Sequence, residues 1–222
     1  MVAMLYVEGR LARGGLAIVG SRTPPQEAVD FAYELARRCG EPVISGLALG
    51  VDAAAHRGAL AAGLPTVAFV GYGFGATYPP EHRELEREII AAGGAVATEC
   101  APGTPVTDAA LIRRDRLQAE HARAVVLIAS ELEGGAMHTV RFSRELGKPI
   151  YALNPQEERA TLSQAYWGNL SALREGAVAL PLDVDEALLI IRSADSTIAS
   201  TRSANRASGS PKISGPDSTT SG

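Results

Sequence analysis

Short apolar segments alternate with longer amphipathic segments along most of the chain. The apolar segments are rich in Val, Ile and Ala, which is typical of strands buried on both faces of a sheet. They cover Leu16–Val19, Glu41–Ile44, Thr66–Val70, Ala95–Thr98, Ala124–Ala129 and Pro149–Ala152. Helical patterns separate them, over Thr23–Gly40, Gly50–Leu60, Pro80–Ala92, Thr107–Glu120 and from Thr139 to Gly147. Because strands that alternate with helices form parallel βαβ units, we predict an α/β fold with a doubly wound, mostly parallel sheet and helices on both faces.

The pattern changes at both ends of the chain. Met4–Val7 predicts an edge strand, which we expect to end at Glu8 and Gly9. After Asn154 the pattern is weaker and predicts a helix at 162–175, a strand at 176–180 and a helix at 184–192. From Ser193 on, Ser, Thr, Gly, Pro and Asn predominate, and such a segment buries too little apolar surface to order itself. We therefore expect one domain over residues 1–192 and a disordered tail over residues 193–222.

Glycines follow the predicted strands rather than precede them, as at Gly20, Gly46, Gly50, Gly134 and Gly135. The loops that follow parallel strands gather at the carboxyl edge of the sheet, which is where such folds bind ligands. We therefore expect the functional site at this edge.

The segment from Ser45 to Leu60 joins a strand to an Ala-rich helix. Gly46 and Gly50 allow a sharp turn, and a helix that begins near Gly50 would direct its free N–H groups at an anion. The loop is not a P-loop, because no Gly-Lys-Ser/Thr follows. Ser45, Gly46 and Gly50 fit turn geometry as well as anion binding, and the two interpretations are compatible.

Asp52 and His56 are four residues apart, so we expect them to share a helical face and to point near the mouth of the site. Asp52 is either a first-turn acid favoured by the helix dipole or a carboxylate that orients a base or a sugar. His56 is more typical of a packed or capping residue than of a catalyst, because no nucleophile lies near it in the sequence.

The net charge of −4 and the pI of 5.6 do not indicate a nucleic-acid-binding protein as a whole, so any polyanion site must be a local basic patch. Arg22 directly follows a strand and Ser21, where its guanidinium can bind a phosphate. Arg114 and Arg116 lie on one predicted helix, where a solvated charged face is the alternative interpretation. Gly134 and Gly135 before a helix form either a second anion site or a plain left-handed turn.

Other features exclude several classes of protein. Cys39 and Cys100 have neither disulfide nor metal-ligand spacing, and the four histidines form no pair at zinc-binding spacing, so we predict no metal and no cofactor. The sequence shows no signal-peptide pattern and no apolar run of membrane-spanning length, so we expect a soluble, cytoplasmic protein without membrane contact. The loop at 71–75 lacks the dinucleotide-binding spacing, and its aromatic neighbours Tyr72, Phe74 and Tyr78 either stack on bases or close the core.

Several motifs together resemble the DNA-processing protein A family (DprA, also called Smf). They are Ala17-Ile-Val-Gly-Ser-Arg22, the segment Ser45–His56, the Tyr78-Pro79 loop, Glu99…Pro102-Gly103, Arg114-Asp-Arg116, Gly134-Gly-Ala-Met-His-Thr139 and Asn169-Leu170. They occur in order from about Leu5 to Ile191. The family's usual Phe-Pro-x-Arg-Asn-Arg stands here as Leu111-Ile-Arg-Arg-Asp-Arg116, so that Leu replaces an aromatic residue and Asp115 replaces an asparagine.

The resemblance implies an extended Rossmann-like domain that binds single-stranded DNA in a basic pocket, forms a homodimer and helps to load the recombinase RecA in natural transformation. It implies a binding protein rather than an enzyme. The DNA- or phosphate-binding residues that we expect are Gly20, Ser21, Arg22, Ser45, Gly46, Gly50, Asp52, His56, Arg114, Arg116, Gly134, Gly135 and Thr139, with no catalytic residue.

Two alternatives use the same glycine-rich loops. One is a nucleoside-monophosphate phosphoribohydrolase of the cytokinin-activating LOG type, whose Pro-Gly-Gly-x-Gly-Thr motif is loosely echoed by Glu133-Gly-Gly-Ala-Met-His-Thr139. The other is a nucleotide sensor that binds a mononucleotide without turnover.

Overall fold

The computed structural model describes residues 4–154 and 163–193. The strands are β1 (Tyr6–Gly9), β2 (Leu16–Val19), β3 (Val43–Ser45), β4 (Thr66–Phe69), β5 (Ala95–Thr98), β6 (Ala124–Leu127), β7 (Ile150–Leu153) and β8 (Val178–Leu180). The helices are α1 (Gln26–Arg38), α2 (Val51–Ala61), α3 (Arg83–Ala91), α4 (Asp108–His121), α5 (Ala136–Glu145) and α7 (Trp167–Arg174), with short 3-10 turns η1 (Pro80–His82) and η2 (Gln164–Tyr166). Residues 184–193 are also helical.

By the contacts between its residues, the chain divides into two compact units, Met1–Leu188 and Leu189–Gly222. The first unit contains the sheet. The predicted tail lies, from residue 194 on, outside the described residues, and so does the first residue of the helix predicted from Leu162.

The strands of the described residues form one eight-stranded sheet in the order β1-β5-β4-β3-β2-β6-β7-β8. Every neighbouring pair is parallel except β1 with β5, where β1 is an antiparallel edge strand. The predicted doubly wound, mostly parallel sheet is therefore confirmed. The predicted edge strand is also present, but it extends to Gly9 because Glu8 and Gly9 pair with Val96 and Ala95 of β5.

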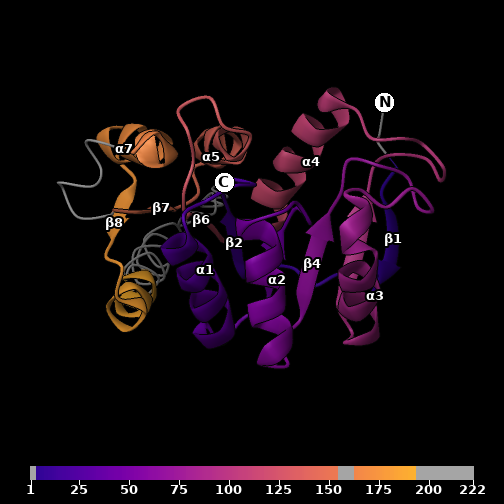
Figure 1. Ribbon diagram of the computed structural model, residues 1–222, viewed down its shortest axis with the longest axis horizontal. Coiled ribbons are helices and arrows are strands. Elements are labelled where there is room, and N and C mark those ends of the chain that lie inside the picture. The colour runs from indigo at the N-terminus through magenta and orange to yellow at the C-terminus, as the bar shows by residue number, and fades with distance from the viewer. Residues whose placement is uncertain (1–3, 155–162, 194–222) are drawn as a thin grey trace, which may run out of the picture. The chain divides into compact units, whose positions relative to one another are not determined.

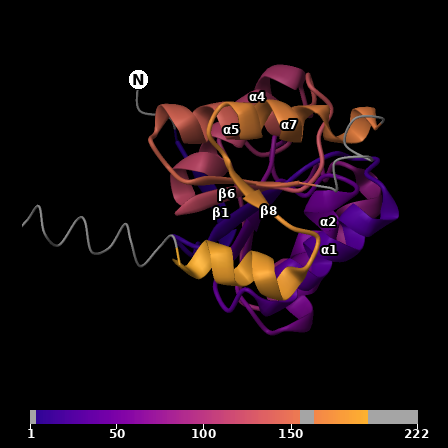
Figure 2. The same ribbon diagram turned by 90° about the vertical axis from the view of Figure 1, so that its left-hand side faces the viewer.

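Helices cover both faces of the sheet, with α4, α5 and α7 on one side and α1 and α2 on the other (Figure 2). Alternate residues of the strands point to the two sides, as strand geometry requires. In β4, Val67 and Phe69 belong to the core that includes Leu117 of α4, whereas Ala68 belongs to the core that includes Leu85 of α3. Both faces are apolar, which explains the continuous rather than alternating hydrophobic pattern of the strands.

The sheet reverses its winding direction between β2 and β6 (Figure 1). The chain runs from β2 outward through β3, β4 and β5, then returns to β6 beside β2 and continues to β7 and β8. The loops that follow β2 and β6 therefore diverge to opposite faces, and the space between them is where such sheets bind ligands. The pairing of Val19 with Leu127 brings the ends of these two strands together.

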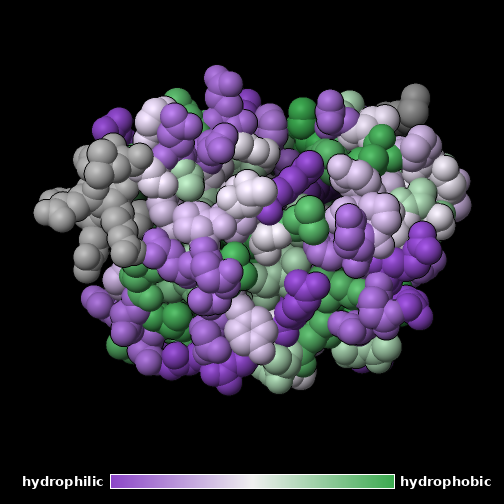
Figure 3. All heavy atoms as spheres, in the orientation of Figure 1, coloured by the Kyte–Doolittle hydropathy of each residue, from purple (hydrophilic) through white to green (hydrophobic). Residues whose placement is uncertain are grey.

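The surface seen in Figure 3 mixes hydrophilic and hydrophobic residues and does not gather the apolar ones into a single patch. No helix of the described residues is long and apolar enough to cross a membrane. Within the same ranges, no three His, Cys, Asp or Glu side chains are grouped as metal ligands would be.

Candidate functional site

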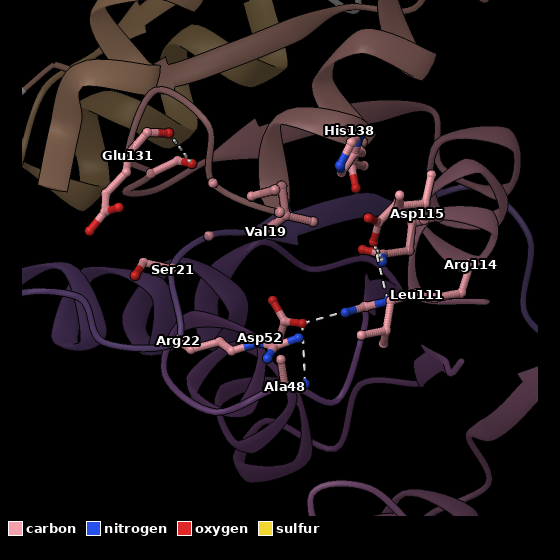
Figure 4. Close-up of a pocket in the computed structure, with 18 of the residues that line it drawn as sticks. Val19, Ser21, Arg22, Ala48, Asp52, Leu111, Arg114, Asp115, Glu131 and His138 are labelled. Atoms are coloured by element: carbon pink, nitrogen blue, oxygen red, sulfur yellow. Dashed lines mark hydrogen bonds and ion pairs between the residues drawn. The ribbon is translucent and has the colours of Figure 1, made fainter. Parts of the chain in front are cut away.

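We call the place between β2 and β6, where the sheet reverses its winding direction, the switch point. A cavity of about 470 Å³ lies there, between the loops that follow β2 and β6 and the helices α4 and α5 (Figure 4). Ligand pockets for small molecules typically enclose about 300–1,000 Å³, so this cavity has room for a nucleotide. Its polar and charged lining residues are Ser21, Arg22, Thr23, Asp52, Asp108, Arg114, Asp115, Gln118, Ser130, Glu131, His138 and Thr139.

Arg114 of α4 supplies a buried positive charge to the cavity wall. Its side chain is 9% exposed, with Nη1 3.6 Å from Asp52 Oδ2 and Nε 3.2 Å from Asp115 Oδ1 (Figure 4). The guanidinium lies directly against Gly46, since a Cβ atom added there would be 1.0 Å from Arg114 Nη1. Gly46 is therefore required by the close approach of this arginine.

The Asp52 carboxylate is held by the loop that precedes its own helix. Its Oδ2 accepts hydrogen bonds from the backbone N–H groups of Gly46 and Ala48, each at 3.2 Å. Among the described residues, Oδ1 has no hydrogen-bond or ion-pair partner, and the residue lines the cavity. Asp52 thus occupies the first turn of α2, as one interpretation expects, and its carboxylate lines the cavity; that it orients a base or a sugar stays a prediction.

Asp115 is a buried acid beside Arg114. Gln118 Nε2 donates to its Oδ1 at 3.1 Å, and Oδ2 has no hydrogen-bond or ion-pair partner among the described residues. Burial raises the pKa of Asp115 from 3.8 to about 7, assisted by the nearby charge of Asp52 and opposed mainly by Arg114. The cavity therefore contains a carboxyl group that changes its charge near neutral pH.

This raised pKa predicts that the protein loses stability as the pH rises from about 4 to about 7. In that window unfolded Asp115 has released its proton and folded Asp115 retains it, so the unfolded state binds fewer protons and the free energy of unfolding falls with pH. Asp115→Asn is expected to remove this fall in the free energy of unfolding. The fall amounts to about 1.4 kcal/mol for each unit by which the pKa of Asp115 differs between the folded and unfolded states. Urea denaturation of both proteins across the window measures the effect, and parallel pH profiles would contradict it.

The loop after β2 places a cation at the mouth of the cavity. Arg22 is exposed and has no hydrogen bond or ion pair within the described residues. The loop itself is fixed, because Ser21 N–H donates to Ala129 O at 2.7 Å and Ser21 O accepts from Val51 N–H at 3.2 Å. At Gly20 a Cβ atom would be 2.6 Å from Val51 Cγ2, so close packing on α2 explains this glycine.

The loop after β6 ends in the N-terminus of α5, which faces the same cavity. Gly135 has φ −54° and ψ −35°, so the predicted alternative of a left-handed turn is wrong. No acceptor among the described residues binds the N–H groups of Gly135 and Ala136, which suits an anion site. Thr139 lies one turn further on, buried at 1% exposure, and its Oγ1 has no hydrogen-bond partner in the part of the chain that the structure describes.

Asn169 of α7 anchors this loop from behind. Its Oδ1 accepts from Ser130 N–H at 3.0 Å, and its Nδ2 donates to the carbonyls of Leu127, Ile128 and Leu153 at 2.9–3.2 Å. The side chain is fully buried. The side-chain amide of Asn169 therefore joins α7 to the ends of β6 and β7 and fixes the start of the loop that follows β6.

The structure corrects several of the predicted site residues. His56 does not point to the mouth: it is fully buried, with Nδ1 2.7 Å from Thr66 Oγ1, because its face of α2 packs on the sheet. Ser45 is buried and donates to Ile18 O at 2.7 Å. Arg116 does not line the cavity, since its guanidinium pairs with Glu99 at 2.7 Å and Glu120 at 2.5 Å.

The loop between β3 and α2, which we predicted as an anion site, has fewer free N–H groups than expected. Oxygen atoms of the chain occupy three of its N–H groups, because Asp52 accepts from two of them and Ser21 O accepts from Val51. Gly50 has φ 74° and lies against Ser21 O, so it serves the turn and the packing rather than the cavity.

Residues that the sequence interpretation missed include Gln118 and Glu131, which line the cavity, and Asn169 as an anchor. Gln118 follows Arg114 and Asp115 by one helical turn, so helical spacing gave a usable signal for it.

Of the three aromatic residues near the loop at 71–75, Tyr72 is buried and donates to Glu86 at 2.8 Å, Phe74 packs on the core, and Tyr78 is half-exposed beside the cavity.

Comparisons with known proteins give the family. The family model described as DNA recombination-mediator protein A matches residues 1–190. A DNA processing protein DprA of Mycobacterium tuberculosis is 36% identical over 164 residues, which covers 72% of this chain and 41% of that protein. The chain thus spans less than half the length of this curated relative.

Two solved structures have the same fold. DprA of Streptococcus pneumoniae matches with a TM-score of 0.73 and 24% identity, covering 83% of this chain and 65% of that chain. DprA of Helicobacter pylori, a structure described for its single-stranded DNA binding mode, matches with a TM-score of 0.70 and 24% identity, covering 85% and 86%. From the match over residues 1–190 and the identity to the DprA of Mycobacterium tuberculosis, the chain belongs to the DNA recombination-mediator protein A (DprA/Smf) family.

Proposed function

We propose that the cavity at the switch point binds single-stranded DNA, without catalysis. The observation that carries this proposal is the pairing of an unengaged arginine, Arg22, with the free N–H groups at the start of α5, across the mouth of one cavity. Cations and helix N-termini are the two groups that hold phosphates most readily in proteins.

The interior suits a base rather than a second phosphate. The buried side chains of Asp52, Asp115 and Gln118 place acceptor oxygens on the wall, and these would repel a phosphate. Only an unstacked base can enter such a space, which favours a single strand over a duplex. The relative from Helicobacter pylori, whose description names single-stranded DNA binding, supports the same ligand for this chain.

Family membership supports further parts of the proposal. We infer that the protein acts in the cytoplasm as a homodimer and assists a RecA-type recombinase in natural transformation. Two cavities in one dimer would bind the same strand, and the second cavity would gain affinity through effective concentration.

Arg22→Ala is expected to weaken oligonucleotide binding by about tenfold, since the variant removes a charge-assisted hydrogen bond to phosphate. The slope of log affinity against log salt should fall by about 0.7 for each phosphate that the variant no longer neutralises. Fluorescence anisotropy with a labelled single strand measures both quantities. Arg57→Ala is the matched control, because Arg57 is exposed on α2 and does not line the cavity. Equal affinities and slopes for the two variants would remove Arg22 from the site.

A nucleotide-hydrolysing enzyme is the second candidate. The observation that favours it is the presence of two buried carboxylates, Asp52 and Asp115, in a cavity of nucleotide size. Carboxylates of this kind act as general acids or bases when they lie beside a scissile bond. Incubation with AMP and with GMP distinguishes the two functions: release of the free base from either nucleotide supports the enzyme, and intact AMP and GMP support the binding protein.

A further inference from the structure

Three side chains on the wall of the cavity carry acceptor oxygens without a partner. Asp52 Oδ1 and Asp115 Oδ2 have no hydrogen-bond or ion-pair partner among the described residues, and buried Gln118 Oε1 has none either. All three residues line the cavity and are more than nine-tenths buried. Gln118 Oε1 is buried, so leaving it without a partner costs free energy, and the two carboxylate oxygens are strong acceptors, so all three favour a ligand that brings donors.

One strong donor lies directly beside these acceptors. The Arg114 guanidinium is 3.2 Å from Asp115 and 3.6 Å from Asp52, and it lines the same wall. Thr139 Oγ1, buried and without a partner among the described residues, supplies a hydroxyl that can donate or accept. The wall thus combines one cationic donor with several acceptor oxygens.

This arrangement complements guanine better than the other bases. Guanine carries donors at N1 and N2 next to the acceptor O6, and arginine is the side chain that most often binds O6 and N7. Thymine has one donor between two acceptors, and adenine and cytosine each offer a single amino group on this edge. We infer that the cavity selects guanine, with Asp115 as the residue that determines this specificity. The inference rests on the proposed function, because it names the base that this cavity accepts.

The guanine can come from a DNA strand or from a free guanine nucleotide. The cavity is large enough for either, and Arg22 at its mouth would bind the phosphate of both. The wall of the cavity would contact the guanine base in the same way in a DNA strand and in a free nucleotide, so an experiment has to distinguish these two ligands.

Protonation of Asp115 provides a second readout of guanine selection. The charged and titratable groups that line the cavity with this acid are Arg114 and Asp108 of its own helix, Asp52 of α2, Arg22 after β2, Glu131 after β6 and His138 of α5. Of these, Arg114, Asp52 and Arg22 act on its pKa. The pKa of Asp115 is about 7, whereas burial and Arg141 lower the pKa of His138 below 6.5. Above neutral pH the Asp115 carboxylate therefore accepts charge-assisted hydrogen bonds from guanine, and below it the proton removes the negative charge and turns one acceptor oxygen into a donor.

The test measures anisotropy at about pH 8 with oligothymidylates that contain one central guanine, hypoxanthine, adenine or cytosine. The guanine strand is expected to bind about tenfold more tightly than the unsubstituted strand. Hypoxanthine, which lacks the 2-amino group, should lose most of that advantage. Asp115→Asn should abolish the guanine preference, and lowering the pH to about 6 should weaken it in the wild-type protein only. Asp30→Asn, the same change at an exposed position of α1, is the control.

The outcomes separate this inference from the proposed function. Equal binding of all strands would overturn guanine selection and leave DNA binding intact. If no strand binds but GMP binds to the wild-type protein and not to Asp115→Asn, guanine selection holds with a free nucleotide as its source and the proposed function fails. If neither a strand nor GMP binds, both are overturned.

Discussion

Asn169→Leu is expected to destabilise the protein by about 2–4 kcal/mol. Leucine has a similar size, so the loss comes from hydrogen bonds rather than from a cavity. The substitution leaves buried Ser130 N–H without its acceptor at 3.0 Å and removes the donor to the carbonyls of Leu127, Ile128 and Leu153. Because Ser130 lies in the loop after β6 and lines the cavity, weaker oligonucleotide binding should accompany the loss of stability.

Urea denaturation measures this effect, with Ser171→Ala as the control on the same helix. Ser171 donates to Glu175 at 2.8 Å on the exposed side of α7, so its loss should change the free energy of unfolding by less than about 0.5 kcal/mol. Asn169→Asp keeps the acceptor for Ser130 but directs a carboxylate at three carbonyls, and it should also be destabilising. An Asn169→Leu protein as stable as the Ser171→Ala protein would contradict the anchoring role.

Arg114→Met is expected to cost about 3–5 kcal/mol, because breaking a buried ion pair leaves charge without compensation. Here two buried carboxylates, Asp52 and Asp115, would lose their shared cation. The pKa of Asp115 should rise further when Arg114, the main influence that lowers it, is removed. The loss of stability should therefore be greatest above neutral pH and smaller in acid.

A double-mutant cycle with Asp115→Asn isolates this coupling. If Arg114 compensates the charge of Asp115, the double variant should be more stable than the sum of the two single effects predicts, by about 0.5–3 kcal/mol. Urea denaturation of the four proteins at about pH 8, where wild-type Asp115 is charged, gives the coupling energy. Additive effects would show that the two side chains do not interact.

Most of the fold could be predicted from the sequence, because both faces of the sheet are buried and its strands form nearly continuous apolar runs. The strand Leu16–Val19 has the predicted bounds, and each predicted helix is present with its ends shifted by a few residues. The end of β1 at Glu8 and Gly9 was not predictable, because these residue types usually end a strand. Here they continue it because they pair with β5, which is distant in the sequence. Strand order likewise depends on long-range packing and not on local pattern.

The candidate site was predictable in its position and less so in its members. Glycines after strands indicate the carboxyl edge, and Arg22, Arg114, Gly134 and Thr139 do line the cavity there. His56 was misplaced because helical spacing gives a shared face for two residues but does not say how deep each lies. Arg116 was wrongly expected at the cavity because its two ion pairs were not foreseen. Glu99 is distant in the sequence, and Glu120 is one of several charged residues on the same helix.

Binding of a single DNA strand in the cavity at the switch point is the central claim, and one measurement tests it most directly. That measurement is fluorescence anisotropy of the wild-type protein with a labelled single-stranded oligonucleotide, across a salt series and with AMP as competitor. We predict tight binding that weakens steeply with salt, since phosphate binding releases counterions, and that AMP barely disturbs. Absent binding, affinity that does not change with salt, or binding that AMP abolishes would contradict the claim.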